Sequence, residues 1–134
     1  MANTTRVGIE TVFEFIGPDG RPAPVPVELG YRADEPHAVS MTFRMADQAT
    51  VWLVSRDLLA DGLVAATGEG DVRLRPFTAR AAILELYSDD EHAVFHVPVG
   101  SLQAFLNSSY DVVAPGREGD FLDIDSALRG LFAE

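Results

Sequence analysis

Residues 5–32 read TRVGIETVFEFIGPDGRPAPVPVELGYR and contain two runs in which apolar and polar positions alternate. Every second residue from Val7 to Phe15 is apolar or β-branched, and every second residue from Val25 to Tyr31 is apolar or aromatic. A period of two places such residues on one face of a strand. Gly-Pro-Asp-Gly at 17–20 suits a chain reversal between the runs. The stretch therefore predicts two antiparallel strands with one buried face, and Pro26 places the second at a sheet edge or at a strand start.

The next 30 residues continue this pattern. Apolar residues alternate from Val39 to Met45, and 50–55 form another apolar run after a short connection. Four strands joined by short loops predict an antiparallel meander. A short helix over Arg56 to Asp61 follows, with Ser55 as its N-cap and Gly62 at its C-terminal cap.

The second half contains three more predicted strands and two helices. The strands are Asp71–Pro76, Ala81–Tyr87 and Ala93–Val97, with Gly68-Glu69-Gly70 as a loop before the first and 88–91 as the charged turn of a hairpin. Apolar residues recur at helical spacing from Ser101 to about Tyr110, and again over about 123–132. Residues 112–120, which contain proline and glycine, predict a flexible loop or linker.

Together these elements predict one α+β domain over residues 1–134, built on a curved antiparallel seven-stranded sheet or open β-barrel with a few helices. Some apolar residues fall on the nominally outer side of the strands, for example Val12, Val51 and Ala81. Such residues indicate a second buried face, either under a helix or against another subunit.

Charge is the strongest compositional feature. Ten arginines stand against 21 Asp and Glu, giving a net charge of −11 with no lysine. This charge disfavours binding to nucleic-acid backbones and to anionic membrane surfaces. No cysteine is present, which removes disulfides and thiolate sites, and no signal peptide or membrane-spanning run is visible. We expect a cytoplasmic protein without membrane insertion.

No catalytic, cofactor or metal site emerges from the residue pattern. His92 and His96 are four residues apart, but on a strand that spacing separates the imidazoles by about 13 Å, too far for one zinc ion. Three adjacent carboxylates at 89–91 lack the spacing of a calcium loop. Asp123 and Asp125 resemble the start of such a loop, but capping of the last predicted helix explains them better than calcium binding does. We therefore predict a non-enzyme without cofactors.

Four residues are candidates for contacts with a partner protein: Trp52, Arg56, Arg73 and Arg75. Trp52 is the single tryptophan, a residue type enriched in interface hot spots, although a core or rim position explains it well. Arg56 follows it at the start of the first helix. Arg73 and Arg75, with Arg80, form the one cluster of cations, which could contact the carboxylates of a partner. The alternative interpretation is a solvated face on which these arginines pair with local Asp and Glu.

Several segments resemble the SsgA-like proteins, small actinomycete proteins of sporulation and cell division. The similarity is clearest in VWLVSRDLLADGL at 51–63, and it extends to PVPVEL at 24–29, DEPHAV at 34–39, GEGDVR at 68–73 and FLDID at 121–125. Departures at His37, Val54 and Leu74 leave the subfamily open, an SsgB type among them.

The resemblance implies a non-enzymatic adaptor of sporulation-specific division. In that case the fold is a whirly-like β-barrel, the assembly a homotrimer, the location the division septum, and the partner FtsZ or another SsgA-like protein. The alternative function is single-stranded nucleic-acid binding, because whirly-like barrels elsewhere bind single strands. Such binding needs a cationic groove with exposed aromatic residues, which an acidic chain does not favour. A small-molecule enzyme or carrier is the third hypothesis, and it requires a deep pocket with converging polar groups.

Overall fold

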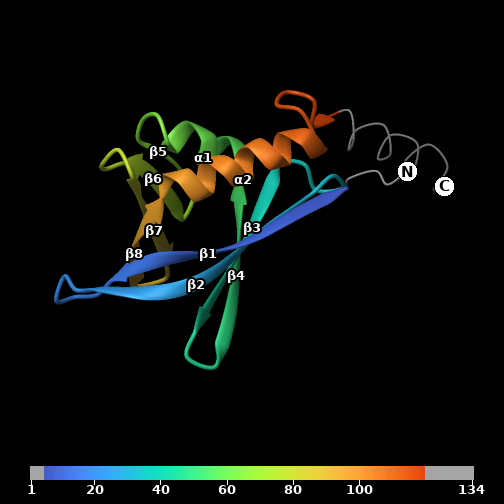
Figure 1. Cartoon of the computed structure of the whole chain (residues 1–134). Helices are drawn as coiled ribbons and strands as arrows, with labels where there is room; N and C mark the ends of the chain where they lie inside the picture. Colours follow the sequence, from blue (N-terminus) through green and yellow to red (C-terminus); the bar gives the residue numbers. More distant parts are fainter. Residues whose placement is uncertain (1–4, 120–134) are drawn as a thin grey trace.

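In the computed structural model, which describes residues 5–119, eight strands form one antiparallel sheet in the order β4-β3-β2-β1-β8-β7-β6-β5 (Figure 1). The first strand is thus central, since β1 pairs with β2 on one side and with β8 on the other. The strands are β1 (Arg6–Ile16), β2 (Pro22–Arg32), β3 (Ala38–Met45), β4 (Gln48–Ser55), β5 (Thr67–Glu69), β6 (Val72–Pro76), β7 (Ala81–Ser88) and β8 (Glu91–Pro98).

The register of the first three strands follows the alternation in the sequence. Phe13 lies opposite Val25, and Leu29 lies between Ile9 and Met41. Phe13, Val25, Leu29 and Met41 are buried and Ile9 is partly buried. Their neighbours along each strand point to the outer face. Because a strand has a period of two, this register brings the apolar sets of β1 to β3 together on one face.

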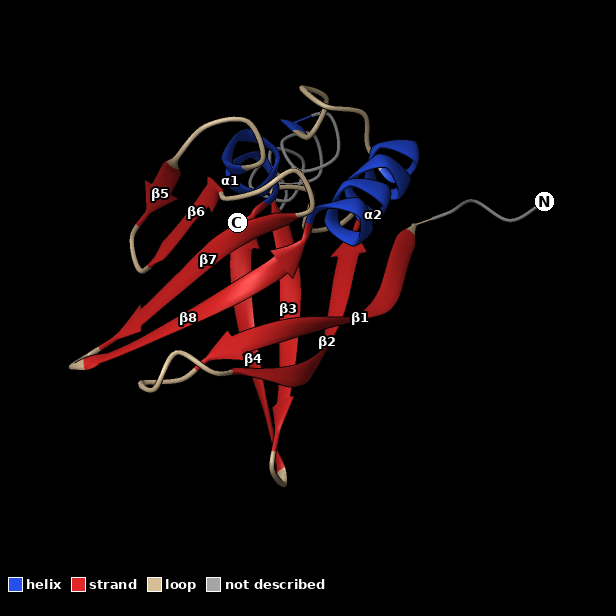
Figure 2. Ribbon diagram, turned by 60° about the vertical axis from the view of Figure 1, so that its left-hand side comes forward, coloured by secondary structure: helices blue, strands red, loops and turns tan. Residues whose placement is uncertain are grey.

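Two helices cover one end of the curled sheet (Figure 2). Helix α1 (Arg56–Gly62) contacts β4, β5 and β6, and α2 (Val99–Val112) contacts β1, β2 and β8. The predicted cap of α1 is confirmed, because the Ser55 hydroxyl accepts a hydrogen bond of 3.2 Å from the backbone N–H of Leu58. The inner faces of the strands and the buried sides of both helices enclose one apolar core. No helix among the described residues is long and apolar enough to cross a membrane.

The α+β class and the curved antiparallel sheet are confirmed, with eight strands where seven were predicted. The additional strand is β5, which lies in the segment predicted as a loop and pairs with β6 from Thr67–Leu74 to Glu69–Val72. Gly70 has a positive φ of 60° in the two-residue turn between these strands, a conformation that glycine adopts at little cost. Three residues around a glycine are too few for an alternating pattern to reveal a strand.

Three other local predictions need correction. Gly62 is the last residue of α1 and not its C-terminal cap, which is Leu63. Strand β2 lies inside the sheet, but its pairing with β3 begins only at Val27, so Pro26 lacks a strand partner on that side. The predicted loop begins one residue later than expected, because Val112 still belongs to α2, and residues 113–118 form a packed loop and not a linker, since Val113 and Glu118 are buried. The predicted helix over 123–132 lies outside the described residues.

Candidate interaction surfaces

Arg56 is a buried hub between the two helices and not a surface residue. Its side chain is 1% exposed, and its guanidinium carbon lies 4.6 Å from the ring centre of Tyr31 and 4.9 Å from that of Tyr110. Its Nη1 donates hydrogen bonds to the carbonyl oxygens of Ser109 (3.2 Å) and Val113 (2.7 Å) at the end of α2. A cation at these carbonyls is favourable, because the C-terminus of a helix carries partial negative charge.

Glu118 completes this hub from the segment that follows α2. Its Oε2 accepts a hydrogen bond of 2.6 Å from Arg56 Nη2, and its side chain is 8% exposed. The bond from Arg56 lowers the pKa of the Glu118 carboxyl below its ordinary value. Nearby, burial raises the pKa of Tyr31 to about 12, and the Tyr31 hydroxyl donates to the Pro36 carbonyl oxygen at 2.8 Å. The Arg56 side chain therefore holds α1, α2 and residues 113–119 together, and in this arrangement it does not reach a partner.

Arg73 and Arg75 lie side by side on the outer face of β6. The guanidinium of Arg73 lies 5.7 Å from the ring centre of Tyr87, and Arg75 Nε lies 3.9 Å from Glu85 Oε1. Glu85 also bonds His92, whose ring stacks on Tyr87 with centroids 4.3 Å apart. These five residues, which we call the polar ladder, are partly or fully exposed, so Arg73 and Arg75 are accessible to a partner while each also has a local one.

Trp52 lies on the edge strand β4, at the opposite end of the strand order from β6, although the cleft that it lines also includes His92 of the polar ladder. Its side chain faces inward, opposite Met41, and is partly buried against the core. This position agrees with a rim residue and leaves part of the indole accessible. The four candidate residues thus do not form one surface: Arg56 is inside, Arg73 and Arg75 share one face, and Trp52 lines a different cleft, together with Phe15, Phe43 and Phe95.

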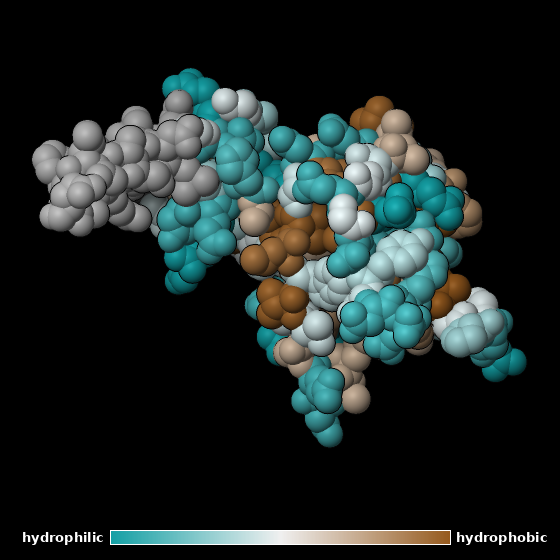
Figure 3. Space-filling model, turned by 180° about the vertical axis from the view of Figure 1, so that it is seen from behind, coloured by the Kyte–Doolittle hydropathy of each residue, from teal (hydrophilic) through white to brown (hydrophobic). Residues whose placement is uncertain are grey.

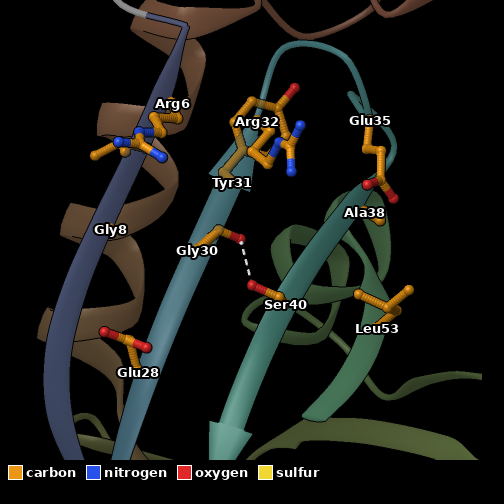
Figure 4. A pocket seen from close by; sticks show the side chains of 11 residues that line it. Arg6, Gly8, Glu28, Gly30, Tyr31, Arg32, Glu35, Ala38, Ser40 and Leu53 are labelled. Atoms are coloured by element: carbon orange, nitrogen blue, oxygen red, sulfur yellow. Dashed lines mark hydrogen bonds between the residues drawn. The ribbon is translucent and has the colours of Figure 1, made fainter.

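A shallow trough of about 480 Å³ crosses the outer face of β1, β2 and β3 (Figure 4). Gly8 pairs with Gly30, and Gly30 pairs with Ser40, so three neighbouring strands carry small residues at the same level. The Ser40 hydroxyl donates to the Gly30 carbonyl oxygen at 3.4 Å, and a Cβ added to Gly30 would lie 2.7 Å from Ser40 Oγ. The trough ends on one side at Leu53 of β4.

Apolar side chains are exposed along the same outer face. Val12, Val51 and Leu53 are 50%, 57% and 62% exposed, and Leu53 lies directly opposite Ser40. The view from behind shows apolar residues gathered above the projecting β3–β4 hairpin, next to hydrophilic ones (Figure 3). Val51 and Leu53 are neighbours on β4, whereas Val12 lies on β1, beyond the Glu28–Arg44 ion pair. Monomeric proteins rarely leave contiguous large apolar side chains in water. This outer apolar face, defined by Val12, Val51 and Leu53, is a candidate for association.

The histidines and acidic turns gather no set of three potential metal ligands within residues 5–119. His92 bonds Glu85, and His96 contacts the ring of Phe77 at a centroid distance of 5.0 Å. Asp89 begins the two-residue turn between β7 and β8 with a φ of 50°.

Reasoning from the sequence missed two features of these surfaces. One is Glu118, which lies 62 positions from Arg56 and gives no local signal of that pairing. The other is the trough, for which a signal exists: Gly8 and Gly30 both occupy polar positions of alternating runs. A glycine inside a strand often marks a close approach of another backbone or a ligand.

Comparison with known proteins places the chain in a family. Residues 25–118 match the family model described as Streptomyces sporulation and cell division protein, SsgA. The chain is 42% identical over 123 residues to the sporulation-specific cell division protein SsgB of Saccharopolyspora erythraea, covering 90% of this chain and 87% of that protein. It is 35% identical to SsgB of Streptomyces coelicolor, with 98% of both chains covered.

The fold agrees with that relationship. The crystal structure of an SsgA-like sporulation-specific cell division protein from Thermobifida fusca superposes with a TM-score of 0.87 at 33% identity, covering 98% of this chain and 99% of that one. The resemblance carried by 24–39, 51–63 and 68–73 is thereby confirmed. This chain belongs to the SsgA family of sporulation and cell division proteins.

Proposed function

We propose that the chain acts in sporulation-specific cell division as a non-enzymatic adaptor, in the cytoplasm and at the division septum. The observation that carries this proposal is the similarity to proteins named for that process over nearly the whole length of both chains. The described surface adds to it, because its accessible features are an apolar face and a polar ladder, and neither gathers groups around a reacting centre.

The proposed assembly is a homo-oligomer, with a trimer as the expected state. Its support is the outer apolar face, which has the composition of a surface that another subunit covers. An oligomer presents several copies of each binding surface, which raises avidity for a polymeric partner even when each contact is weak.

The proposed partner is a division protein, FtsZ or another SsgA-like protein, and Arg73 and Arg75 are the cations offered to it. Arg75 is 49% exposed and its contact with Glu85 is long, so a partner's carboxylate can replace that contact at little cost. Charged rim residues of this kind mainly accelerate and orient association.

The test is complementation of a sporulating actinomycete that lacks its own copy of this protein. We expect the wild-type chain to restore sporulation septa, and the double variant Arg73→Glu/Arg75→Glu to fold but to restore few septa and to lose capture of the partner. The matched control is Arg21→Glu/Arg44→Glu, which changes the charge equally at two arginines outside the ladder. Normal septation without the chain would overturn the proposed function, and full activity of the ladder variant would overturn only the ladder's role.

Single-stranded nucleic-acid binding stays the alternative. The exposed ring of Phe77 beside His96 is a stacking surface of the kind such binding uses. The net charge of −11 opposes it. A titration with labelled single strands at low salt distinguishes the two functions, because tight and salt-sensitive binding would favour the alternative.

A further inference from the structure

A cleft of about 360 Å³ lies among residues next to the β1–β2, β3–β4 and β7–β8 turns. These three turns lie at the end of the curled sheet away from both helices (Figure 2). The turn ends of three hairpins form its walls, since Phe15 is the next-to-last residue of β1, Met45 ends β3 and Glu91 begins β8. We call it the aromatic cleft and define it by Phe15, Phe43, Met45, Trp52, Glu91 and Phe95.

The inner part of the aromatic cleft is a packed and preformed aromatic cluster. The ring of Phe95 lies 4.9 Å from that of Phe43 and 5.5 Å from that of Phe15, measured between centroids. Phe43 and Phe95 are buried at 4% and 2% exposure, whereas Trp52 and Phe15 are partly buried and Met45 is 42% exposed. Hot spots of protein interfaces are pockets of this kind, in which an apolar anchor is fully desolvated, and Met adapts to anchors of different shape.

Carboxylates without ion-pair partners lie in the two turns next to this cleft, and one of them, Glu91, lines it. Asp47 lies in the two-residue turn after Met45, and Asp89 and Asp90 form the turn just before Glu91. None of these four acidic residues has a cationic group within 4.0 Å in the part of the chain that the structure describes. The cleft lining contains no arginine, and its one basic residue is His92, which bonds Glu85.

We propose that the aromatic cleft is the docking site for a short segment of a partner protein that combines a large apolar side chain with flanking lysine or arginine. The apolar side chain fills the space over Phe43 and Phe95 and against Trp52. The flanking cations face Asp47, Asp89, Asp90 and Glu91, which lose no existing ion pair when they bind. The proposal rests on the proposed adaptor function, because it names one surface through which that function operates.

This site differs from the outer apolar face in position and in charge. Val51 and Leu53 alternate with Trp52 along β4 and therefore point to the opposite side of the sheet. A second copy of this acidic chain would bring further carboxylates to the mouth of the cleft, which disfavours self-docking there.

The position of Trp52 provides the assay. Because it is the single tryptophan, the intrinsic fluorescence of the protein reports directly on the cleft. A displayed library of random peptides is selected against the wild-type protein, and the selected peptides are synthesised and titrated while the tryptophan emission is recorded. We expect the selected peptides to pair a Phe, Leu, Ile or Trp with adjacent Lys or Arg and to shift the Trp52 emission on binding.

Two variants and two matched controls locate the binding. Glu91→Arg and Met45→Glu should each weaken peptide binding by about ten-fold or more while thermal unfolding stays cooperative. Glu69→Arg on β5 and Val64→Glu in the loop after α1 carry the same changes outside the cleft and should bind the peptides as the wild type does.

Several results would overturn the proposal. They are selection of acidic or purely apolar peptides and peptide binding that is unchanged by Glu91→Arg. Selection of no peptide would also overturn it, and septation in the complementation strain would still test the adaptor function separately.

Discussion

At the scale of single residues, Arg56 was predicted as a contact residue for a partner, but the structure places it in the interior. It follows Trp52 in the most distinctive segment of the chain, where an arginine at a helix start suggests a contact residue. In the structure it lies between Tyr31 and Tyr110 and bonds Glu118, so its distinctive neighbourhood reflects a structural hub. No spacing rule connects Arg56 with Glu118, because only the folded chain brings together positions that far apart.

The hub predicts a large cost for removing the cation alone. Arg56→Met keeps much of the packing volume but leaves Glu118 buried without its partner, and we expect a loss of about 3–5 kcal/mol in the free energy of unfolding. Arg56→Met/Glu118→Gln should recover part of that loss, because the unpaired charge is gone. Urea unfolding measures both, with Arg44→Met as an exposed control expected to cost about 1 kcal/mol or less. Equal losses in the two single arginine variants would contradict the hub.

Glu118 also predicts how stability depends on pH. Its pKa in the folded chain lies below the ordinary value of 4.5, so its contribution to folding is complete above that pH and is lost as the pH falls through the lower folded value. Urea unfolding of wild type and Glu118→Gln should therefore give a constant difference near neutrality and converging stabilities in acid. A difference that grows as the pH falls would contradict the assigned direction.

At the scale of elements, long alternating runs made the strands predictable and short segments did not. Strands β1 to β3 each show a period of two over eight residues or more, so their register follows from burying one face, whereas β4 is recognisable as the apolar run at 50–55. Strand β5 has three residues, and residues 113–119 contain proline and glycine. In both segments the conformation is set by packing against the rest of the molecule and not by the local sequence pattern. Likewise, no local pattern joins Phe15, Phe43 and Phe95, which come from three strands, so the sequence gives the aromatic residues but not the cleft.

Glycines in the two helices predict opposite effects of the same substitution. A Cβ at Gly62 would lie 2.6 Å from the Leu74 Cβ, where α1 packs on β6, and Gly62→Ala should destabilise the fold by about 1–3 kcal/mol. Gly100 in α2 has open space around it, and Gly100→Ala should stabilise by up to about 1 kcal/mol. Thermal unfolding of both variants checks the pair. A Gly62→Ala variant as stable as the wild type would show that α1 moves freely on the sheet.

At the scale of the whole molecule, the outer apolar face predicts the state of assembly. We expect the wild-type chain to be a trimer by light scattering and Leu53→Asp to shift it to monomers, because a carboxylate in a covered apolar contact would be buried without a partner. Val64→Asp changes an 83% exposed residue outside this face and should keep the trimer. A wild-type chain that is monomeric at all concentrations would refute the proposed assembly.

The central place of β1 has a consequence for biosynthesis. The ribosome completes β1 through β4 early, and this hairpin series can fold while the remainder is still being made. The second edge of β1, at Glu14 to Ile16, stays open until residues 94–96 have left the exit tunnel. During that interval the nascent chain exposes an unpaired strand edge. Ribosomes that translate the same message bring several such edges close together, so we expect pairing between nascent chains to be the main cause of misfolding during synthesis.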